Sequence, residues 1–287
     1  MRSKLESAVP YSLLAPTLIF VSLLIIIPIF QAFLLAFQGA EGQFTLDNFQ
    51  TMMNDTSFQD ALKFTFLLLI FIVPLQVVLA LAMALLIHTR FKGHTFFLYI
   101  YAIPLAISDL AAGIAWLSIF TERGYLNSIL FSLGIIDRPI IYLSYQNLPA
   151  MFGTIVIAES WRATAIVMTI LLAGLQVIPR DYFEAADVFG ANTIKRTLYV
   201  VLPLLKPSLQ SALIIRTIFA FQTFSVVLVL AGRVIPVLAG ESYNWYVTNR
   251  NPNIAATYAV LILIFTLAAT WVYLKVLKTS PAEAGYD

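Results

Sequence analysis

The feature that most constrains this chain is a series of six long apolar runs separated by more polar segments. The runs cover residues 11–37, 64–87, 96–120, 151–177, 209–231 and 257–277. A helix needs about 20 apolar residues to cross the ~30 Å hydrocarbon core of a bilayer. With 60% hydrophobic and 11% charged residues, the chain also differs strongly from a soluble globule. We therefore expect an all-α integral membrane protein with six transmembrane helices.

The basic residues predict the orientation of these helices. Ten of the 17 Lys and Arg residues lie in the two terminal segments and in the loops 88–95 and 178–208, and only five lie in the other loops. Because loops rich in Lys and Arg stay in the cytoplasm, we expect both termini and the 178–208 loop on that side. No internal repeat is evident, and no loop is long enough for a second domain. Residues 1–287 are thus predicted to form a single transmembrane domain.

The chain offers little to catalysis or metal binding. It has no cysteine, which excludes disulfides, thiolate metal sites and a cysteine nucleophile. Its two histidines, His88 and His94, flank a basic turn. A role of this turn in membrane orientation or in contact with lipid headgroups explains it better than a catalytic role. We expect no catalytic residue and no metal site. The chain also lacks a G-x-x-x-x-G-K-[ST] phosphate loop, so it is predicted to be a non-enzymatic protein with no ATP site of its own.

The loop 178–208 is rich in charged residues, unlike the rest of this apolar chain, and has the pattern of a helical hairpin. Pro179 ends the fourth run, and Asp181 with Glu184 has the form of a capping box that starts a short helix. Gly190 is a natural stop for that helix. The sequence therefore predicts a cytoplasmic helix-turn-helix between the fourth and fifth transmembrane helices.

The first helix of this hairpin is amphipathic, and a second helix capped by Asn192 or Thr193 is predicted to follow. Its acidic stripe consists of Asp181, Glu184 and Asp187, and its apolar stripe consists of Tyr182, Ala185, Ala186 and Phe189. Such a hairpin is either an ordinary connector in the headgroup layer or a docking helix for a partner with a groove. Periodicity alone does not decide between the two.

The spacing of the loop residues is more specific than their periodicity. The loop carries E-A-A at residues 184–186, glycine at 190 and V-x-L-P at 200–203. This pattern resembles the cytoplasmic signature of the membrane permease subunits of binding-protein-dependent ABC importers. That signature is E-A-A, three residues, glycine, nine residues and I-x-L-P, so only Val200 departs from it, by a conservative change.

The resemblance covers nearly the whole chain and is greatest to sugar permeases of the maltose type, on the side of the heterodimer that resembles the larger maltose subunit. The stretches 171–192 and 202–224 carry it. Two departures stand out. Phe189 occupies a position where these permeases usually have Asp, which bears on the docking surface. The sequence "LAGRVIP" at 230–236 replaces a glycine-rich outer loop, which bears on contacts with the binding protein.

The resemblance implies a set of partners and a coupling mechanism. It implies a second homologous permease, two ATP-binding-cassette ATPase subunits that bind ATP and Mg, and an extracytoplasmic solute-binding protein. It also implies a multi-pass location in a prokaryotic cell membrane, with the hairpin seated in a cleft of one ATPase as a coupling helix. The residues expected to couple to the ATPase are Asp181, Glu184, Ala185, Ala186, Asp187, Phe189, Gly190, Leu202 and Pro203.

Four ionisable residues lie inside the predicted spans and away from their ends: Asp109, Glu159, Arg162 and Arg216. Charges within a membrane are costly and mark a function by default. Two acidic and two basic groups can neutralise one another, and Glu159 and Arg162 are spaced i, i+3 on one helix face. The set is either a buried ion-pair cluster that fixes helix packing or the polar lining of a substrate cavity.

The resemblance to maltose-type permeases favours the cavity, because these hold sugar midway along the fourth and fifth helices. By distance from the Glu184 motif, the implied pathway residues are Glu159, Trp161, Arg162, Ala163, Ile166, Arg216, Ala220 and Thr223. Asp109 joins them as the remaining intramembrane charge, and Gln222 is a nearby polar candidate without such support. Trp161 is expected to cover an apolar sugar face.

The expected substrates, on resemblance, are di- or oligosaccharides, especially α-glucosides such as maltose or trehalose. Glycerol phosphate is the alternative, although a phosphate dianion would prefer an excess of positive charge that the balanced set does not supply. A secondary transporter would need no ATPase-docking signature and would normally show repeated halves. An intramembrane hydrolase would need a nucleophile and a base within the spans.

Overall fold

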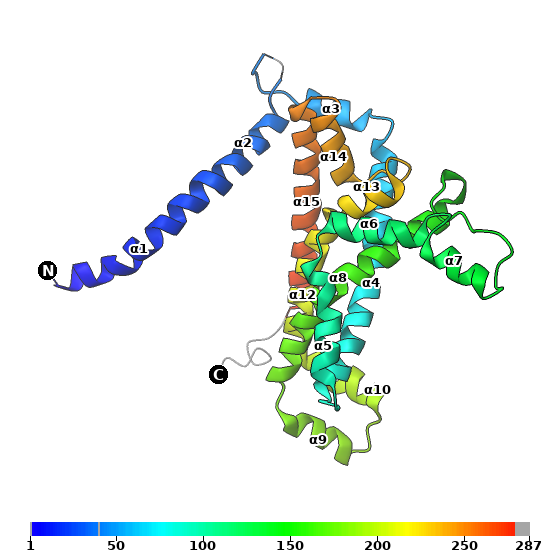
Figure 1. The fold of residues 1–287 in the computed structure, drawn as a ribbon. Coiled ribbons are helices and arrows are strands. Elements are labelled where there is room, and N and C mark those ends of the chain that lie inside the picture. Colours follow the sequence, from blue (N-terminus) through cyan, green and yellow to red (C-terminus); the bar gives the residue numbers. More distant parts are fainter. Residues whose placement is uncertain (1, 40, 279–287) are drawn as a thin grey trace. The chain divides into compact units, whose positions relative to one another are not determined.

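The structure is a computed structural model that describes residues 2–39 and 41–278 (Figure 1). Over these residues the regular elements are helices, and strand-like pairing is limited to an isolated antiparallel bridge between Gln38 and Phe44. The chain forms two compact units, residues 1–58 with 241–261 and residues 59–240 with 262–287. The all-helical prediction is confirmed for the described residues.

The smaller unit contains the N-terminal helical segment, which is α1 (Arg2–Val21), the π-helical η1 (Ser22–Ile26) and α2 (Ile27–Ala36). Its 24 residues from Leu13 to Ala36 form a strongly apolar stretch, and none of the most apolar window is buried within the chain. The unit also holds α3 (Asp47–Met53), most of α14 (Leu238–Val247) and the start of α15 (Pro252–Val276). A helix that is apolar on every side is suited to lipid or to another membrane helix.

The carboxylate of Asp55 holds the smaller unit together. It accepts hydrogen bonds from the indole nitrogen of Trp245 at 2.7 Å and from the hydroxyl of Tyr258 at 3.2 Å. Tyr258 is fully buried, and its ring lies edge-on to that of Phe58 with 6.1 Å between the centroids. The carboxylate therefore joins the segment after α3 to both α14 and α15.

The larger unit is built around α8 (Leu148–Val177), which packs along α12 (Lys206–Phe221) (Figure 1). Of the apolar window of α8, 61% is buried, against 28% for that of α4 (Phe58–His88). α8 is thus the central helix, and its neighbours α4 and α12 bury their own apolar faces against it.

Two apolar clusters fill the larger unit, and they lie at different heights along α4 and α8. One includes Leu68 and Ile72 of α4, Ile155 of α8, and residues of α13 (Ser225–Ala231). The other includes Ala80 and Ala84 of α4, residues 167–175 of α8, and Ala212 of α12. Between these heights the two helices carry their polar residues, so the apolar clusters enclose a polar layer.

The third predicted span is broken. It consists of α5 (His94–Ala102), the 3₁₀ turn η2 (Ile103–Ala106) and α6 (Asp109–Phe120), with a bend of 104° at the break. Pro104 has no N–H to donate, so one hydrogen bond of an α-helix is missing there. Ser108 then starts α6 as its N-cap, because its hydroxyl accepts from the N–H of Ala111 at 3.2 Å. The break places Asp109 at the first residue of a helix, deep within the chain's apolar sequence.

The fifth predicted span is also interrupted, since α12 ends at Phe221 and α13 begins at Ser225. The residues before it form α10 (Thr193–Arg196), the π-helical η4 (Thr197–Val201) and α11 (Leu202–Leu204), which meet α12 at 76°. The remaining elements are α7 (Tyr125–Ser132), the 3₁₀ turn η3 (Tyr145–Asn147) and α9 (Arg180–Val188).

Four helical segments of the described residues are long and apolar enough to cross a membrane, and six if each bent pair is counted as one span. The protein is therefore a multi-pass membrane protein. The count of six spans stays a prediction, because it depends on how the two bent pairs lie in the bilayer.

The contact between α8 and α12 yields a testable prediction at Gly174. A methyl group added there would lie 2.9 Å from a methyl carbon of Leu205 and closer still to the hydroxyl oxygen of Ser208. Overpacking of this kind costs about 1–3 kcal/mol. We expect Gly174→Ala to lower the midpoint of thermal unfolding in detergent, measured by tryptophan fluorescence.

The matched control is Gly153→Ala on the same helix, where an added methyl group meets nothing within 4 Å. Alanine favours a helix by about 1 kcal/mol over glycine, so this variant should unfold at the same temperature as the parent or higher. Equal midpoints for the two variants would contradict a close α8–α12 contact.

Candidate functional site

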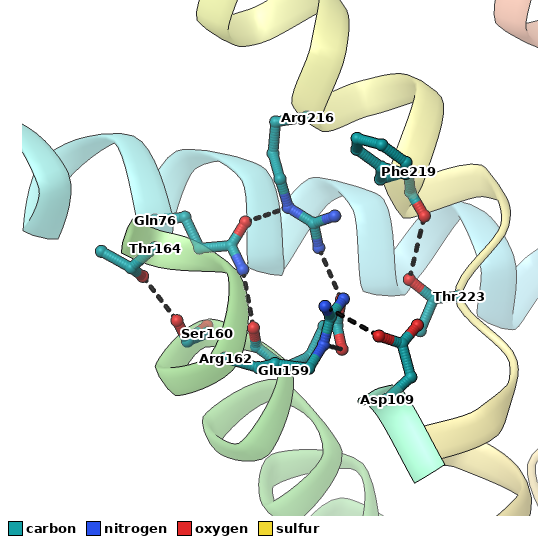
Figure 2. A network of polar contacts seen from close by, with 9 residues as sticks. All are labelled: Gln76, Asp109, Glu159, Ser160, Arg162, Thr164, Arg216, Phe219 and Thr223. Carbon is teal, nitrogen blue, oxygen red and sulfur yellow. Dashed lines mark hydrogen bonds and ion pairs between the residues drawn. The ribbon is translucent and has the colours of Figure 1, made fainter. Parts of the chain in front are cut away.

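The four intramembrane charges predicted from the sequence form one polar network in the larger unit (Figure 2). Glu159 and Arg162 come from the middle of α8, Arg216 from α12, and Asp109 from the first residue of α6. The break in the third span is what brings Asp109 within reach. Residues far apart in sequence are thus joined in one layer between the two apolar clusters.

Arg162 is held by two carboxylates at once. Its Nη2 donates to Oε1 of Glu159 at 2.8 Å, and its Nε donates to Oε2 of the same residue at 3.3 Å. Its Nη1 lies 2.8 Å from Oδ1 of Asp109. All three nitrogens of this guanidinium therefore face a carboxylate oxygen, which is the geometry in which arginine binds anions best.

Arg216 is buried, with 1% of its side chain exposed, and shares Glu159 with Arg162. Its Nη2 donates to Oε1 of Glu159 at 3.0 Å, and its Nε donates to the side-chain oxygen of Gln76. The amide nitrogen of Gln76 in turn donates to the backbone oxygen of Glu159 at 2.8 Å. Nη1 of Arg216 has no hydrogen-bond partner among the described residues.

The network is electrically balanced, because two carboxylates face two guanidinium groups. Removing a charge from water costs several kcal/mol, and mutual attraction offsets this only where the geometry is good. The short contacts of Glu159 meet that condition, since its carboxylate accepts from both arginines. Loss of one member would leave a buried charge without its counterion.

A cavity of about 320 Å³ opens beside this network, and we call it the charged cavity. It is lined by Asp109, Arg162, Ala163, Ile166, Arg216, Phe219 and Gln222. Its volume is at the lower end of the range of small-molecule sites, about 300–1,000 Å³. Five of the nine predicted pathway residues line it, and Glu159 lies behind them within the ion pairs.

Trp161 does not line the charged cavity, although the resemblance placed it in the same predicted substrate pathway as Glu159 and Arg162. It lies in a second, apolar cavity of about 490 Å³ between α4, α5, α6 and α8. There its ring meets that of Trp116 edge-on, with 5.8 Å between the centroids. Neighbouring residues of an α-helix point about 100° apart, so Trp161 and Arg162 face different sides of α8.

Ala220 and Thr223, also predicted, are buried and do not line either cavity. The hydroxyl of Thr223 donates to the backbone oxygen of Phe219 at 3.4 Å, at the point where α12 ends (Figure 2). Gln222, named without support from the resemblance, does line the charged cavity.

Sequence reasoning missed Gln76 and Phe219. Gln76 is fully buried and supports both Arg216 and Glu159. The signal for it was present, because a lone amide two residues after Pro74 in an otherwise apolar run needs a hydrogen-bond partner. Phe219 is one of many phenylalanines of the chain, so composition gave no reason to select it.

The loop 178–208 contains two short helices, α9 and α10, joined by a turn, and its role as a coupling hairpin stays a prediction. α9 ends at Val188, and Gly190 follows with a left-handed φ of 71°, as the predicted helix stop requires. Asn192 caps α10, because its Oδ1 accepts from the N–H of Lys195 at 2.8 Å. The capping-box prediction is wrong, since the N-cap of α9 is Pro179 and no side chain caps the helix. Asp181 instead lies in the first turn, where a carboxylate still favours the helix dipole.

The predicted coupling residues differ in exposure. Asp181, Glu184, Ala185 and Asp187 are exposed on α9, and 88% of Phe189 is exposed, whereas Ala186 is buried. Asp187 pairs with Nη1 of Arg196 at 2.8 Å, which joins α9 to α10. Leu202 and Pro203 begin α11 after the π-helical turn. The loop therefore presents an acidic surface with the exposed ring of Phe189, while Ala186 and the partly buried Phe183 pack inward.

Comparison with known proteins identifies relatives over nearly the whole chain. The trehalose/maltose transport system permease protein MalF of Thermococcus litoralis is 32% identical over 285 residues, which covers 94% of each chain. The sulfoquinovosyl glycerol transport system permease protein SmoG of Agrobacterium fabrum is 32% identical over 280 residues, covering 93% of this chain and 89% of that one. No protein-family model matches the sequence.

Solved structures share the fold. A bacterial ABC transporter involved in the import of the acidic polysaccharide alginate matches with a TM-score of 0.81, over 96% of this chain and 97% of that one, at 18% identity. A bacterial alginate ABC transporter in complex with an alginate pentasaccharide-bound periplasmic protein matches with a TM-score of 0.78, at 20% identity, over 98% of this chain and 99% of that one. Together with the spaced E-A-A motif on an exposed helix, these relatives show that the chain belongs to the maltose-type family of sugar ABC importer permeases.

Proposed function

We propose that this chain is one of two permease subunits of an ATP-driven importer of uncharged di- or oligosaccharides, with α-glucosides such as maltose or trehalose foremost. The observation that carries the proposal is the balanced set of charges beside the charged cavity, midway along α8 and α12. Sugars need hydrogen-bond donors and acceptors but no excess of either charge. A relative whose name gives trehalose and maltose supports the same substrate class.

The proposed path for the sugar includes the residues that line the charged cavity, with Glu159 as their support. The chain would supply half of the path, and a second, homologous permease would close it. Trp161, Ala220 and Thr223 belong to this path only if another conformation of the transporter turns them toward the sugar. Movement of the helices between inward-facing and outward-facing states would expose the site to each side in turn.

We further propose that residues 1–287 act as one domain with six spans and both termini in the cytoplasm, where α9 acts as the coupling helix. Exposure of Glu184, Asp187 and Phe189 supports a docking role, because these side chains lie outside the packing of the chain and are free to contact a partner. Two ATPase subunits would bind ATP and Mg, and an extracytoplasmic binding protein would deliver the sugar. The protein itself would then need no cofactor.

The experiment that tests this function is ATP hydrolysis by the reconstituted complex. The chain would be placed in lipid with the ATPase and second permease encoded near it, and loaded binding protein would be added across a panel of sugars. Stimulation by one neutral sugar is the expected result. If the complex assembles and no sugar stimulates ATP hydrolysis, the assignment of a sugar substrate is wrong. If the chain assembles with no ATPase, the proposal of an importer is contradicted.

The turn after α9 gives a prediction about coupling. Gly190 has φ 71°, and a valine there would be strained, so the turn should rearrange and shift α9 in its cleft. We expect Gly190→Val to lower sugar transport per ATP hydrolysed by about tenfold, measured in vesicles with a loaded binding protein. A shift of α9 of about 1 Å is enough for such a loss, if the coupling depends on close docking.

Gly134 offers a matched control for this substitution. It has φ 68° and, like Gly190, an added side-chain carbon would meet nothing within 4 Å, but it follows α7 in a predicted outer loop. Gly134→Val should thus bring similar backbone strain and leave the transport ratio unchanged. An equal loss in both variants would mean that general destabilisation, rather than coupling, causes the effect.

The role of Gln76 as a support of the network gives a prediction about stability. Gln76→Leu removes the acceptor of the buried Arg216 Nε, and a buried donor left without a partner costs about 1–3 kcal/mol. We expect a lower midpoint of thermal unfolding in detergent. Gln146→Leu, at an exposed position, serves as the control and should stay within about 0.5 kcal/mol of the parent. An unchanged midpoint for Gln76→Leu would show that the network does not depend on this amide.

A further inference from the structure

We propose that Asp109 sets the charge selectivity of the charged cavity, so that the site admits uncharged sugars and rejects sugars carrying a carboxylate, sulfonate or phosphate. This inference rests on the proposed function, because it assigns the substrate class of the same cavity. It goes further by naming the residue that distinguishes uncharged from anionic sugars. The four charged side chains differ in how far each is accessible to a ligand in the cavity.

Each of the two arginines is already paired with a carboxylate of the protein. All three nitrogens of Arg162 face Glu159 or Asp109, and 15% of its side chain is exposed. Arg216 is 1% exposed and donates to Glu159 and Gln76. An anionic ligand would have to displace a buried carboxylate before it could form a bidentate pair with either guanidinium, which costs the pairing energy of that carboxylate.

Asp109 is the charge that remains in reach. Half of its side chain is exposed, against 1% for Glu159, and only its Oδ1 is engaged by Arg162. Its other oxygen makes no hydrogen bond within the described part of the chain and can accept from a sugar hydroxyl. Although both arginines also line the cavity and the network is neutral, the most exposed of its four charges is therefore negative.

A bound anion would add a third negative charge to two positive ones. Repulsion by Asp109 of an anion roughly 6 Å away, at an effective dielectric constant of about 20, would by itself lower affinity on the order of a hundredfold. Attraction by the paired guanidinium groups, together with screening, reduces this to about tenfold. The uncharged part of the lining offers the amide of Gln222 and the ring of Phe219. These suit hydroxyls and an apolar sugar face.

Nη1 of Arg216 has no partner, and it is the group that could reverse this selectivity. It is shielded from solvent, and its charge is already matched by Glu159. A neutral oxygen, such as a hydroxyl or a water molecule, would satisfy it without adding charge.

The test uses the assembled complex in lipid nanodiscs and a matched pair of sugars, maltose and its counterpart with one C6 oxidised to a carboxylate. Binding of each sugar to the complex would be measured by equilibrium titration without binding protein. We expect the parent to bind maltose about tenfold more tightly than the acid. Asp109→Asn should narrow that ratio at least fivefold by improving binding of the acid, and Asp109→Glu, which keeps the charge, should preserve it.

Two results would overturn the inference: a parent complex that prefers the acid, or a ratio that Asp109→Asn leaves unchanged. ATP hydrolysis stimulated by sugar-loaded binding protein, measured on the same complex, separates this outcome from a failure of the proposed function. Stimulation without binding of either sugar at the permease would refute the inference and leave the importer standing. Absence of stimulation by any sugar would instead contradict the importer itself.

Discussion

The carboxylate of Glu159 is the interaction on which the larger unit depends. It accepts from Arg162 on its own helix and from Arg216 on α12, while its backbone oxygen accepts from Gln76 on α4. A buried anion with these partners opposes sliding of one helix along another. Sliding would lengthen the charge-assisted hydrogen bonds of Glu159, and in a medium of low dielectric this costs much of their energy. The relative height of the three helices is therefore fixed by one side chain, and the apolar clusters above and below pack at the heights that it allows.

This arrangement costs more than an apolar core would, since lipid and apolar side chains could have filled the same layer without burying any charge. Close packing elsewhere offsets part of that cost, most visibly where α8 has Gly174 against Ser208 and Leu205. Helices that approach this closely gain contact without large side chains, as is typical within membranes. A polar layer retained at such cost between two apolar clusters is better explained by a pathway for polar molecules than by stability.

The sequence was sufficient for the class of fold, the family and the gathering of four charges, because each follows from residue types at a spacing. Helix geometry alone turns Trp161 about 100° away from Arg162, but the sequence could not show which of these two directions opens onto the charged cavity. Nor could it show the break before Asp109, because Pro104 is compatible with either a kink or a continuous transmembrane helix. The prediction of the N-cap of α9 was wrong because it relied on spacing alone. Asp181 and Glu184 have the spacing of a capping box, but the helix already begins at Arg180, with Pro179 at the N-cap position.

The path from the coupling loop to the charged cavity is short and stiff. Only Ile178 and Pro179 separate the last residue of α8 from the first of α9. α8 then continues as a single helix to Arg162, which lies 15 residues before Val177, or about 23 Å at 1.5 Å per residue. A displacement of α9 by a docked ATPase would reach Arg162 with little loss along this helix. Because Arg162 holds Asp109 on α6, the same movement would pull on the helix that follows the 104° bend in the third predicted span.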